Sequence, residues 1–170
     1  MESIQGKVWK FGDNIDTDVM VPGQYLDAPM EEVVQHVFES INPGFAKGVK
    51  NSDIIVAGKN FGCGSSRENA PDALKKLGIG CIIAESFARI FFRNAIAIGL
   101  PVISCKNVSS SFDDNDYARV NLPDARIENI TKKKMLTAQS LSEEMLRIIE
   151  KGGILNLLRE MPGEDQKTVQ

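Results

Sequence analysis

Three short apolar runs in the middle of the chain limit its possible folds more than any other feature. They cover residues 53–57, 81–84 and 100–105, and a segment of helical length separates each run from the next. Within each run, apolar residues follow one another without alternating polar residues, which is typical of parallel strands covered on both faces. The sequence therefore predicts an α/β fold with a parallel β-α-β-α-β core.

Helices and further strands are predicted on both sides of this core. Within residues 86–98, apolar side chains recur at three- and four-residue spacing, and Gly99 and Pro101 end the predicted helix. The other expected elements are a strand over residues 6–11, a helix over 30–39, antiparallel strands over 117–122 and 126–131, a helix over 142–150, and a short last helix.

The length and charge of the chain exclude several functions. Its 170 residues suffice for one domain, expected over residues 1–161, with a flexible polar tail over 162–170. The 20 basic and 23 acidic residues give a net charge of -3, which argues against binding nucleic acid. No apolar run approaches the roughly 20 residues that span a bilayer, and the first residues do not form a secretory signal. We therefore expect a cytoplasmic protein that does not act at a membrane.

The cysteines and the single histidine predict no metal site in this chain. Cys63, Cys81 and Cys105 are far apart, whereas zinc and iron-sulfur sites usually contain a close pair such as C-x-x-C. The same spacing predicts no disulfide framework. Cys81 and Cys105 border apolar runs and are expected to be buried, whereas Cys63 lies between two glycines. His36 is expected on the solvated face of its helix.

A glycine-rich polar loop, residues 60–69, follows the first buried strand. Ligands of open α/β sheets bind at the ends of such strands. Gly62 and Gly64 allow backbone conformations that bring N–H groups close to an anion. Ser65, Ser66 and Arg67 add hydroxyl and guanidinium donors, so the loop is a candidate site for a carboxylate or a phosphate.

The same loop also has a purely structural interpretation. Ser65 can cap the next helix with Glu68 as its capping-box partner, in which case the glycines only shape the turn. Pro71 argues against this, because it would then lie inside the helix beyond its first positions. A helix that begins nearer Asn69 or Ala70 leaves Ser65 free in the loop.

Two other polar features allow more than one interpretation. Residues 12–18 superficially resemble an acidic calcium loop but lack its glycine at position six and its glutamate at position twelve, so a turn stabilised by Asx side chains is the default. Arg89 and Arg93 lie four residues apart and share a helix face. They can hold acidic partners or a neighbouring chain, or they are simply solvated.

Three motifs together resemble the family of isopropylmalate isomerase small subunits, in the aconitase superfamily. They are GDNIDTD at residues 12–18, NFGCGSSRE at 60–68 and SFARIFFRN at 86–94, in that order. The resemblance covers roughly residues 4–160 and includes the swivelling C-terminal domain of aconitase and the small subunit of homoaconitase. It implies a three-layer β/β/α swivelling domain. It also implies a large partner subunit whose own cysteines hold a [4Fe-4S] cluster, so that this chain binds none.

The resemblance further implies a hydro-lyase, active only with that large subunit, whose substrate is a small dicarboxylic hydroxy acid. A base removes a proton next to a carboxylate and a hydroxyl departs; water is then added back. Ser65 matches the family's catalytic serine, Arg67 its carboxylate-binding arginine and Ser66 a further substrate contact. Asp18 matches an aspartate that helps to shape the site. The residues that would shape the loop around the serine alkoxide are Gly62, Cys63 and Gly64.

The sequence departs from part of the family in a second loop, formed by Tyr25, Leu26, Asp27 and Ala28. The aconitase and homoaconitase branches carry an arginine there for an additional substrate carboxylate, and a carboxylate at Asp27 would repel that group. The best fit is the isomerisation of 2-isopropylmalate to 3-isopropylmalate in leucine biosynthesis.

Other substrates and one other class of function stay open. The loop is not plainly apolar, so methylmalate (citraconate) and dimethylmalate are alternatives, as is homocitrate (homoaconitate). A non-catalytic module that binds a carboxylate and docks on another protein is the alternative outside enzymology. Without a partner, residues 18–28 are expected to be mobile, because few apolar residues hold them down.

Overall fold

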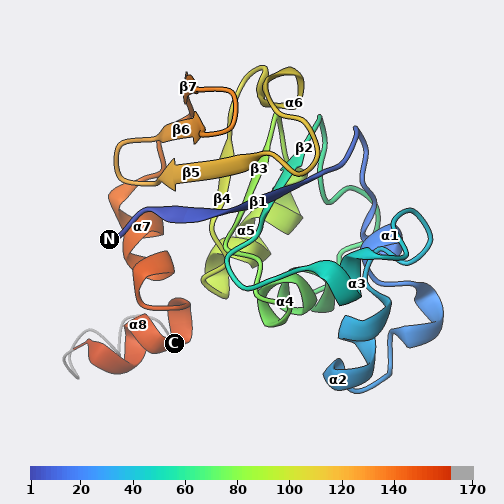
Figure 1. The fold of residues 1–170 in the computed structure, drawn as a ribbon. Coiled ribbons are helices and arrows are strands. Elements are labelled where there is room, and N and C mark those ends of the chain that lie inside the picture. The colour runs from blue at the N-terminus through green and yellow to red at the C-terminus, as the bar shows by residue number, and fades with distance from the viewer. Residues whose placement is uncertain (162–170) are drawn as a thin grey trace.

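The computed structural model describes residues 1–161, which form a mixed sheet of seven strands (Figure 1). The strand order is β4-β3-β2-β1-β5-β6-β7, and β1 joins a parallel half to an antiparallel half. The predicted α/β class with its parallel core is confirmed. The parallel strands are β1 (Ile4–Lys10), β2 (Ile54–Ala57), β3 (Cys81–Ala84) and β4 (Val102–Ser104), and the antiparallel strands are β5 (Tyr117–Asn121), β6 (Arg126–Asn129) and β7 (Lys134–Thr137).

The middle of the parallel half is completely buried. Every residue of β2 and of β3 has no exposed surface, which is why their apolar runs do not alternate with polar residues. Cys81 and Cys105 are buried, as predicted. Burial raises the pKa of both thiols, so neither serves as a thiolate. The predicted tail, residues 162–170, lies outside the described residues.

Two helices of the parallel half carry or border the motifs. Helix α4 (Asn69–Lys76) begins at Asn69, which confirms the start inferred from Pro71 and leaves Ser65 in the loop. Helix α5 (Arg89–Ala97) begins three residues later than predicted. The reason is that Phe87 pairs with Phe61 as a short parallel bridge and Ala88 keeps extended backbone angles.

The segment between β1 and β2 consists of short helical turns. They are α1 (Thr17–Met20), η1 (Gly23–Tyr25), α2 (Met30–Val33), η2 (Val34–His36) and α3 (Phe45–Gly48).

The predicted helix over residues 30–39 is wrong in its second half. Phe38 takes a positive φ of 59° and is fully buried, where its ring stacks on Phe11 at 4.3 Å and meets Phe45 edge-on at 5.0 Å. Packing of these three rings outweighs the helical pattern of the sequence. His36 is not simply solvated, because its half-buried ring stacks on Tyr25 at 3.8 Å.

Residues 18–21 are held to the core more firmly than the sequence suggested. Met20 and Val21 are fully buried, so the expectation that few apolar residues anchor this stretch is wrong. For the largely exposed remainder, residues 22–28, mobility without a partner stays a prediction.

The C-terminal elements pack against the end of the sheet. Helix α7 (Glu143–Glu150) begins where predicted, with the Ser142 hydroxyl accepting a hydrogen bond from the Met145 N–H at 3.1 Å. Helix α8 (Ile154–Glu160) is the expected last helix, and α6 (Val108–Ser111) follows β4. Among residues 1–161, none of the helices has the length and apolar character needed to traverse a bilayer.

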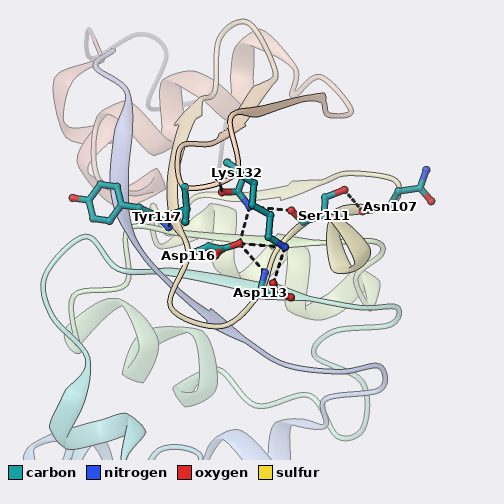
Figure 2. Close-up of polar contacts among 8 residues, drawn as sticks. Asn107, Ser111, Asp113, Asp116, Tyr117 and Lys132 are labelled. Carbon is teal, nitrogen blue, oxygen red and sulfur yellow. Dashed lines mark hydrogen bonds and ion pairs between the residues drawn. The ribbon is translucent and has the colours of Figure 1, made fainter.

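A polar cluster fastens the loop before β5 to the antiparallel strands (Figure 2). The Asp116 carboxylate is buried and accepts hydrogen bonds from the Asp113 N–H and the Asn129 amide, both at 2.8 Å. Asn129 also donates to the Ser111 carbonyl at 3.0 Å. The Lys132 ammonium lies 2.7 Å from the carboxylate of Asp113 and 3.7 Å from that of Asp116. The cluster is therefore a candidate for pH-dependent stability.

Asp116→Asn is expected to lower the free energy of unfolding at pH 7 by about 1–3 kcal/mol, because it breaks buried hydrogen bonds to a charged group. Burial acts to raise the pKa of Asp116, but the hydrogen bonds from Asp113 and Asn129 and the charge of Lys132 outweigh it and hold the pKa below its ordinary value. A lowered folded-state pKa stabilises the fold above the unfolded-state value of about 3.9 and ceases to do so as pH falls through the folded-state value.

Urea unfolding of wild type and variant at pH 7 and at about pH 3 measures this effect. The stability difference should shrink at the lower pH, since only the wild type loses the contribution. Asp124→Asn, at an exposed carboxylate, is the control. An equal difference at both pH values would show that the charge of Asp116 is not what stabilises the cluster.

Candidate active site

The polar loop at residues 12–18 and the glycine loop at residues 60–68 lie side by side. Asp16 and Cys63 form a parallel bridge between them. The Gly62 N–H donates to the Ile15 carbonyl at 2.8 Å, and the Thr17 N–H donates to the Cys63 carbonyl at 2.9 Å. The first two motifs, almost 50 residues apart, therefore form one structural unit.

The two glycines are required by close approach as well as by backbone angle. Gly62 has a φ of +84°, and a Cβ there would lie 2.2 Å from the Phe91 ring of α5. Gly64 has a φ of +92°, and a Cβ there would lie 2.4 Å from the Asp16 carboxylate. Both angles disfavour any side chain. The glycine loop therefore packs closely against the third motif at Gly62 and against the first motif at Gly64.

Ser65, Asp18 and Arg67 meet in this unit. The Ser65 hydroxyl donates to Asp18 Oδ1 at 3.3 Å, and Arg67 Nη2 lies 2.5 Å from the same oxygen. Arg67 Nη1 donates to the Val21 carbonyl at 3.3 Å, and Thr17 Oγ1 donates to the Ser65 carbonyl at 2.8 Å. The loop geometry therefore brings together a hydroxyl, a carboxylate and a guanidinium.

The guanidinium of Arg67 is held in place while its carboxylate partner faces solvent. The Arg67 side chain is 17% exposed and that of Asp18 is 57% exposed. A guanidinium has five N–H donors, and the two contacts to Asp18 and Val21 leave further donors for a ligand. An arginine fixed in this way is suited to binding a carboxylate.

Ser65, Ser66 and Arg67 line one side of a cavity of about 300 Å³. The other side is the start of α5, with Arg89, Ile90 and Phe91 among its lining residues. The sequence predicts that Arg89 shares a helix face with Arg93, but it does not indicate that Arg89 borders this cavity.

Cys63 belongs to the glycine loop but takes no part in this group of polar contacts. Its partial burial, followed by the negative charge of Asp16, raises the pKa of the thiol, and its own backbone hydrogen bond opposes this only in part. The neutral thiol is a poor nucleophile, and the role of Cys63 in shaping the loop stays a prediction.

The residues of this chain do not fit an iron-sulfur cluster. Within residues 1–161, no group of three or more His, Cys, Asp or Glu side chains is placed to hold a metal ion. Cys81 and Cys105 are buried, and Cys63 is only partly exposed in the glycine loop.

Tyr25, Leu26, Asp27 and Ala28 do not border the cavity. Tyr25 ends η1 and is fixed by the stacked His36 ring, and Leu26 is 38% exposed. These four residues are connected to the site through the backbone. Arg67 donates a hydrogen bond to the carbonyl of residue 21, four residues before Tyr25. Their role in specificity stays a prediction.

Residues 13–107 match the aconitase C-terminal domain. The chain belongs to the aconitase C-terminal domain family. The resemblance inferred from the three motifs is thereby confirmed. The glycine loop, residues 13–18 of the neighbouring loop and all of α5 lie within the matched stretch.

Named relatives of this family member are small subunits of isomerases and dehydratases. The isopropylmalate/citramalate isomerase small subunit of Methanocaldococcus jannaschii is 51% identical over 164 residues, 96% of this chain and 98% of that protein. The homoaconitase small subunit of Methanothermobacter thermautotrophicus is 51% identical over 154 residues, 90% of this chain and 89% of that protein.

A solved structure of the same family has the same fold. The crystal structure of 3-isopropylmalate dehydratase from Methanocaldococcus jannaschii superposes with a TM-score of 0.90 and is 39% identical, covering 98% of this chain and 99% of the other. The predicted fold, the swivelling domain of the aconitase C-terminal type, is thereby confirmed.

Proposed function

We propose that this chain is the small subunit of a hydro-lyase that converts 2-isopropylmalate to 3-isopropylmalate by dehydration and rehydration, in leucine biosynthesis. The observation that carries the proposal is the meeting of Ser65, Asp18 and Arg67 on a glycine loop in a member of the aconitase C-terminal domain family. The names of the relatives support it, since they are small subunits of dehydratases and isomerases of related acids. A cytoplasmic location is part of the same proposal.

Each polar residue has a distinct task in this reaction. Arg67 binds a substrate carboxylate through the donors that Asp18 and Val21 leave free. Asp18 orients the Ser65 hydroxyl. As the alkoxide, Ser65 removes the proton next to the bound carboxylate, and the resulting hydroxyl gives a proton back when water is added to the alkene. The charge of Arg67 and the N–H groups of the glycine loop stabilise the serine alkoxide, which in water would be too basic to form. Ser66 supplies a further substrate contact at the cavity wall.

The other half of the active site belongs to a large subunit. The cavity of about 300 Å³ is open and lies at the lower end of the usual range for ligand sites. We assign the activation of the departing hydroxyl to the partner, where the family resemblance puts a [4Fe-4S] cluster. Closure against the partner would also exclude water, which strengthens the interactions of Arg67 and Ser65.

Asp27 favours a substrate with two carboxylates. It is exposed in the loop that follows the Arg67-bound Val21 carbonyl, and its charge would repel a third carboxylate. Identity alone does not choose among substrates, since relatives named for isopropylmalate/citramalate and for homoaconitase are both 51% identical. Isopropylmalate is the leading candidate, and methylmalate or dimethylmalate would fit the same charge pattern.

Anaerobic reconstitution with the large subunit from the same source is expected to give alkene formation from isopropylmalate, and much less from citrate or homocitrate. The reason is the repulsion between Asp27 and a third carboxylate. The assay compares kcat/KM for isopropylmalate, methylmalate, dimethylmalate, citrate and homocitrate.

Three outcomes of this assay would change the proposal. A preference for methylmalate or dimethylmalate would move the same chemistry to another pathway, and a preference for homocitrate would refute the argument from Asp27. Saturable binding of a dicarboxylate by the isolated chain, with no turnover in the complex, would favour the carboxylate-binding module instead.

A further inference from the structure

A second hollow lies beside the candidate active site, between α5 and the chain that follows β7. It has a volume of about 570 Å³ and is called the α5 cleft here. Its far wall is fixed because the Gln139 N–H donates to the Ser104 carbonyl at 2.8 Å, at the end of β4. Helix α7 packs against α5. The lining residues that matter here are Glu85, Phe92, Arg93, Leu141 and Met145, together with Arg89.

The α5 cleft and the Ser65 cavity are neighbours. Arg89 lines both hollows. Both also lie at the carboxyl ends of the parallel strands, with the glycine loop after β2 and the cleft after β3 and β4. A macromolecule that covers Ser65 from the side of α5 would therefore reach the cleft.

Positive charge at the α5 cleft is not balanced by this chain. Arg89 and Arg93 are exposed and have no ion-pair partner among the described residues, whereas Arg67 and Arg119 are each paired with a carboxylate. One carboxylate, Glu85, lies among the lining residues and is not paired with either arginine. The cleft therefore presents two positive charges to one negative charge, and it favours an acidic occupant.

Apolar surface accompanies these charges. Ile90, next to Arg89 in the sequence, is 54% exposed and lines the neighbouring Ser65 cavity. Phe92, Leu141 and Met145 line the α5 cleft while remaining only partly buried. Apolar surface flanked by unpaired arginines is typical of a protein interface, where arginine is enriched and charge sets the fit.

We propose that the α5 cleft is a docking site for the large subunit, which places there a segment with acidic side chains opposite Arg89 and Arg93 and, at the neighbouring Ser65 cavity, an apolar side chain against Ile90. This rests on the proposed function, because it is that reaction which brings a large subunit over Ser65. The position of Arg89 at both hollows and the unbalanced charge favour a protein segment over a small free acid, since the cleft is an open groove along a helix and not an enclosed cavity.

Arg93→Glu is expected to weaken assembly with the purified large subunit by about tenfold or more, because it sets like charges against each other in the interface. Arg93 lines the α5 cleft and not the Ser65 cavity, so its effect reports on docking. The dissociation constant is measured by isothermal titration calorimetry at low and moderate salt. The dissociation constant of the wild-type complex should increase with salt concentration, and that of the variant complex should increase less.

A matched control is Arg126→Glu, which reverses another exposed arginine, on β6 in the antiparallel half, that has no ion-pair partner within residues 1–161. It should assemble with wild-type affinity. Wild-type affinity for Arg93→Glu, with a wild-type unfolding curve, would overturn the proposal. So would binding of a free dicarboxylate that depends on Arg93 while assembly does not. Activity of the wild-type complex tests the proposed reaction separately, so failure of one proposal is distinguishable from failure of the other.

Discussion

Ser65→Ala is expected to lower kcat of the reconstituted complex by about 10²–10⁴-fold, the usual contribution of a positioned acid or base. The variant lacks the hydroxyl that contacts Asp18 and faces the cavity, while Arg67 keeps its own contacts to Asp18 and Val21. Binding of the substrate carboxylate should therefore survive. The measurement is kcat and KM for alkene formation at saturating large subunit, and KM should change little.

Ser66→Ala is the matched control for that experiment. Ser66 lines the same cavity, but the structure gives its hydroxyl no contact with Asp18 or Arg67. Its loss should cost far less than the loss of Ser65. A near-normal rate for Ser65→Ala in a fully assembled complex would mean that another group removes the proton.

Elements that are buried on both faces were predictable from sequence, because their pattern depends on burial alone. The strands β2 and β3 are the examples, and α4 was predictable because Pro71 restricts where a helix can begin. Strand β7 was missed. Its residues are mostly exposed, so no apolar pattern marks it, and its pairing with β6 is what makes it a strand.

Long-range packing explains where the local patterns were wrong. Residues 34–39 have the apolar spacing of a helix, yet Phe38 leaves that conformation to stack between Phe11 and Phe45. Phe11 lies 27 residues before Phe38 in the sequence, so no local pattern indicates that partner. The start of α5 shifts for a similar reason, because Phe87 pairs with a residue of the glycine loop.

The candidate site was predictable as a set of residues but not as a geometry. The motifs identified Asp18, Ser65 and Arg67 as site residues. In the structure, one oxygen of Asp18 contacts both other side chains, and this is possible only because the two loops lie side by side. The contribution of α5 was missed, because apolar spacing on a helix indicates a core face and says nothing of what its exposed residues border. Arg89 and Ile90 at the cavity wall are such residues.

Arg67→Lys is expected to lower kcat/KM of the complex by about 10- to 100-fold, or about 1.4–2.7 kcal/mol. Lysine keeps the positive charge but has a single nitrogen. That nitrogen cannot contact Asp18 and the Val21 carbonyl and also bind a substrate carboxylate, whereas a guanidinium binds a carboxylate in a bidentate manner. Most of the loss should appear as a higher KM, since the carboxylate is bound both before and during the reaction.

The division between KM and kcat is what identifies the role of Arg67. If it only positioned Asp18 and hence Ser65, the lysine variant would lose kcat at unchanged KM, because the Ser65 base would be misplaced while substrate binding continued. A rise in KM at a nearly unchanged kcat instead assigns the guanidinium to the substrate. Arg126→Lys, on the exposed surface of β6, should change neither constant, so that any effect of Arg67→Lys is specific to the site where the two loops meet.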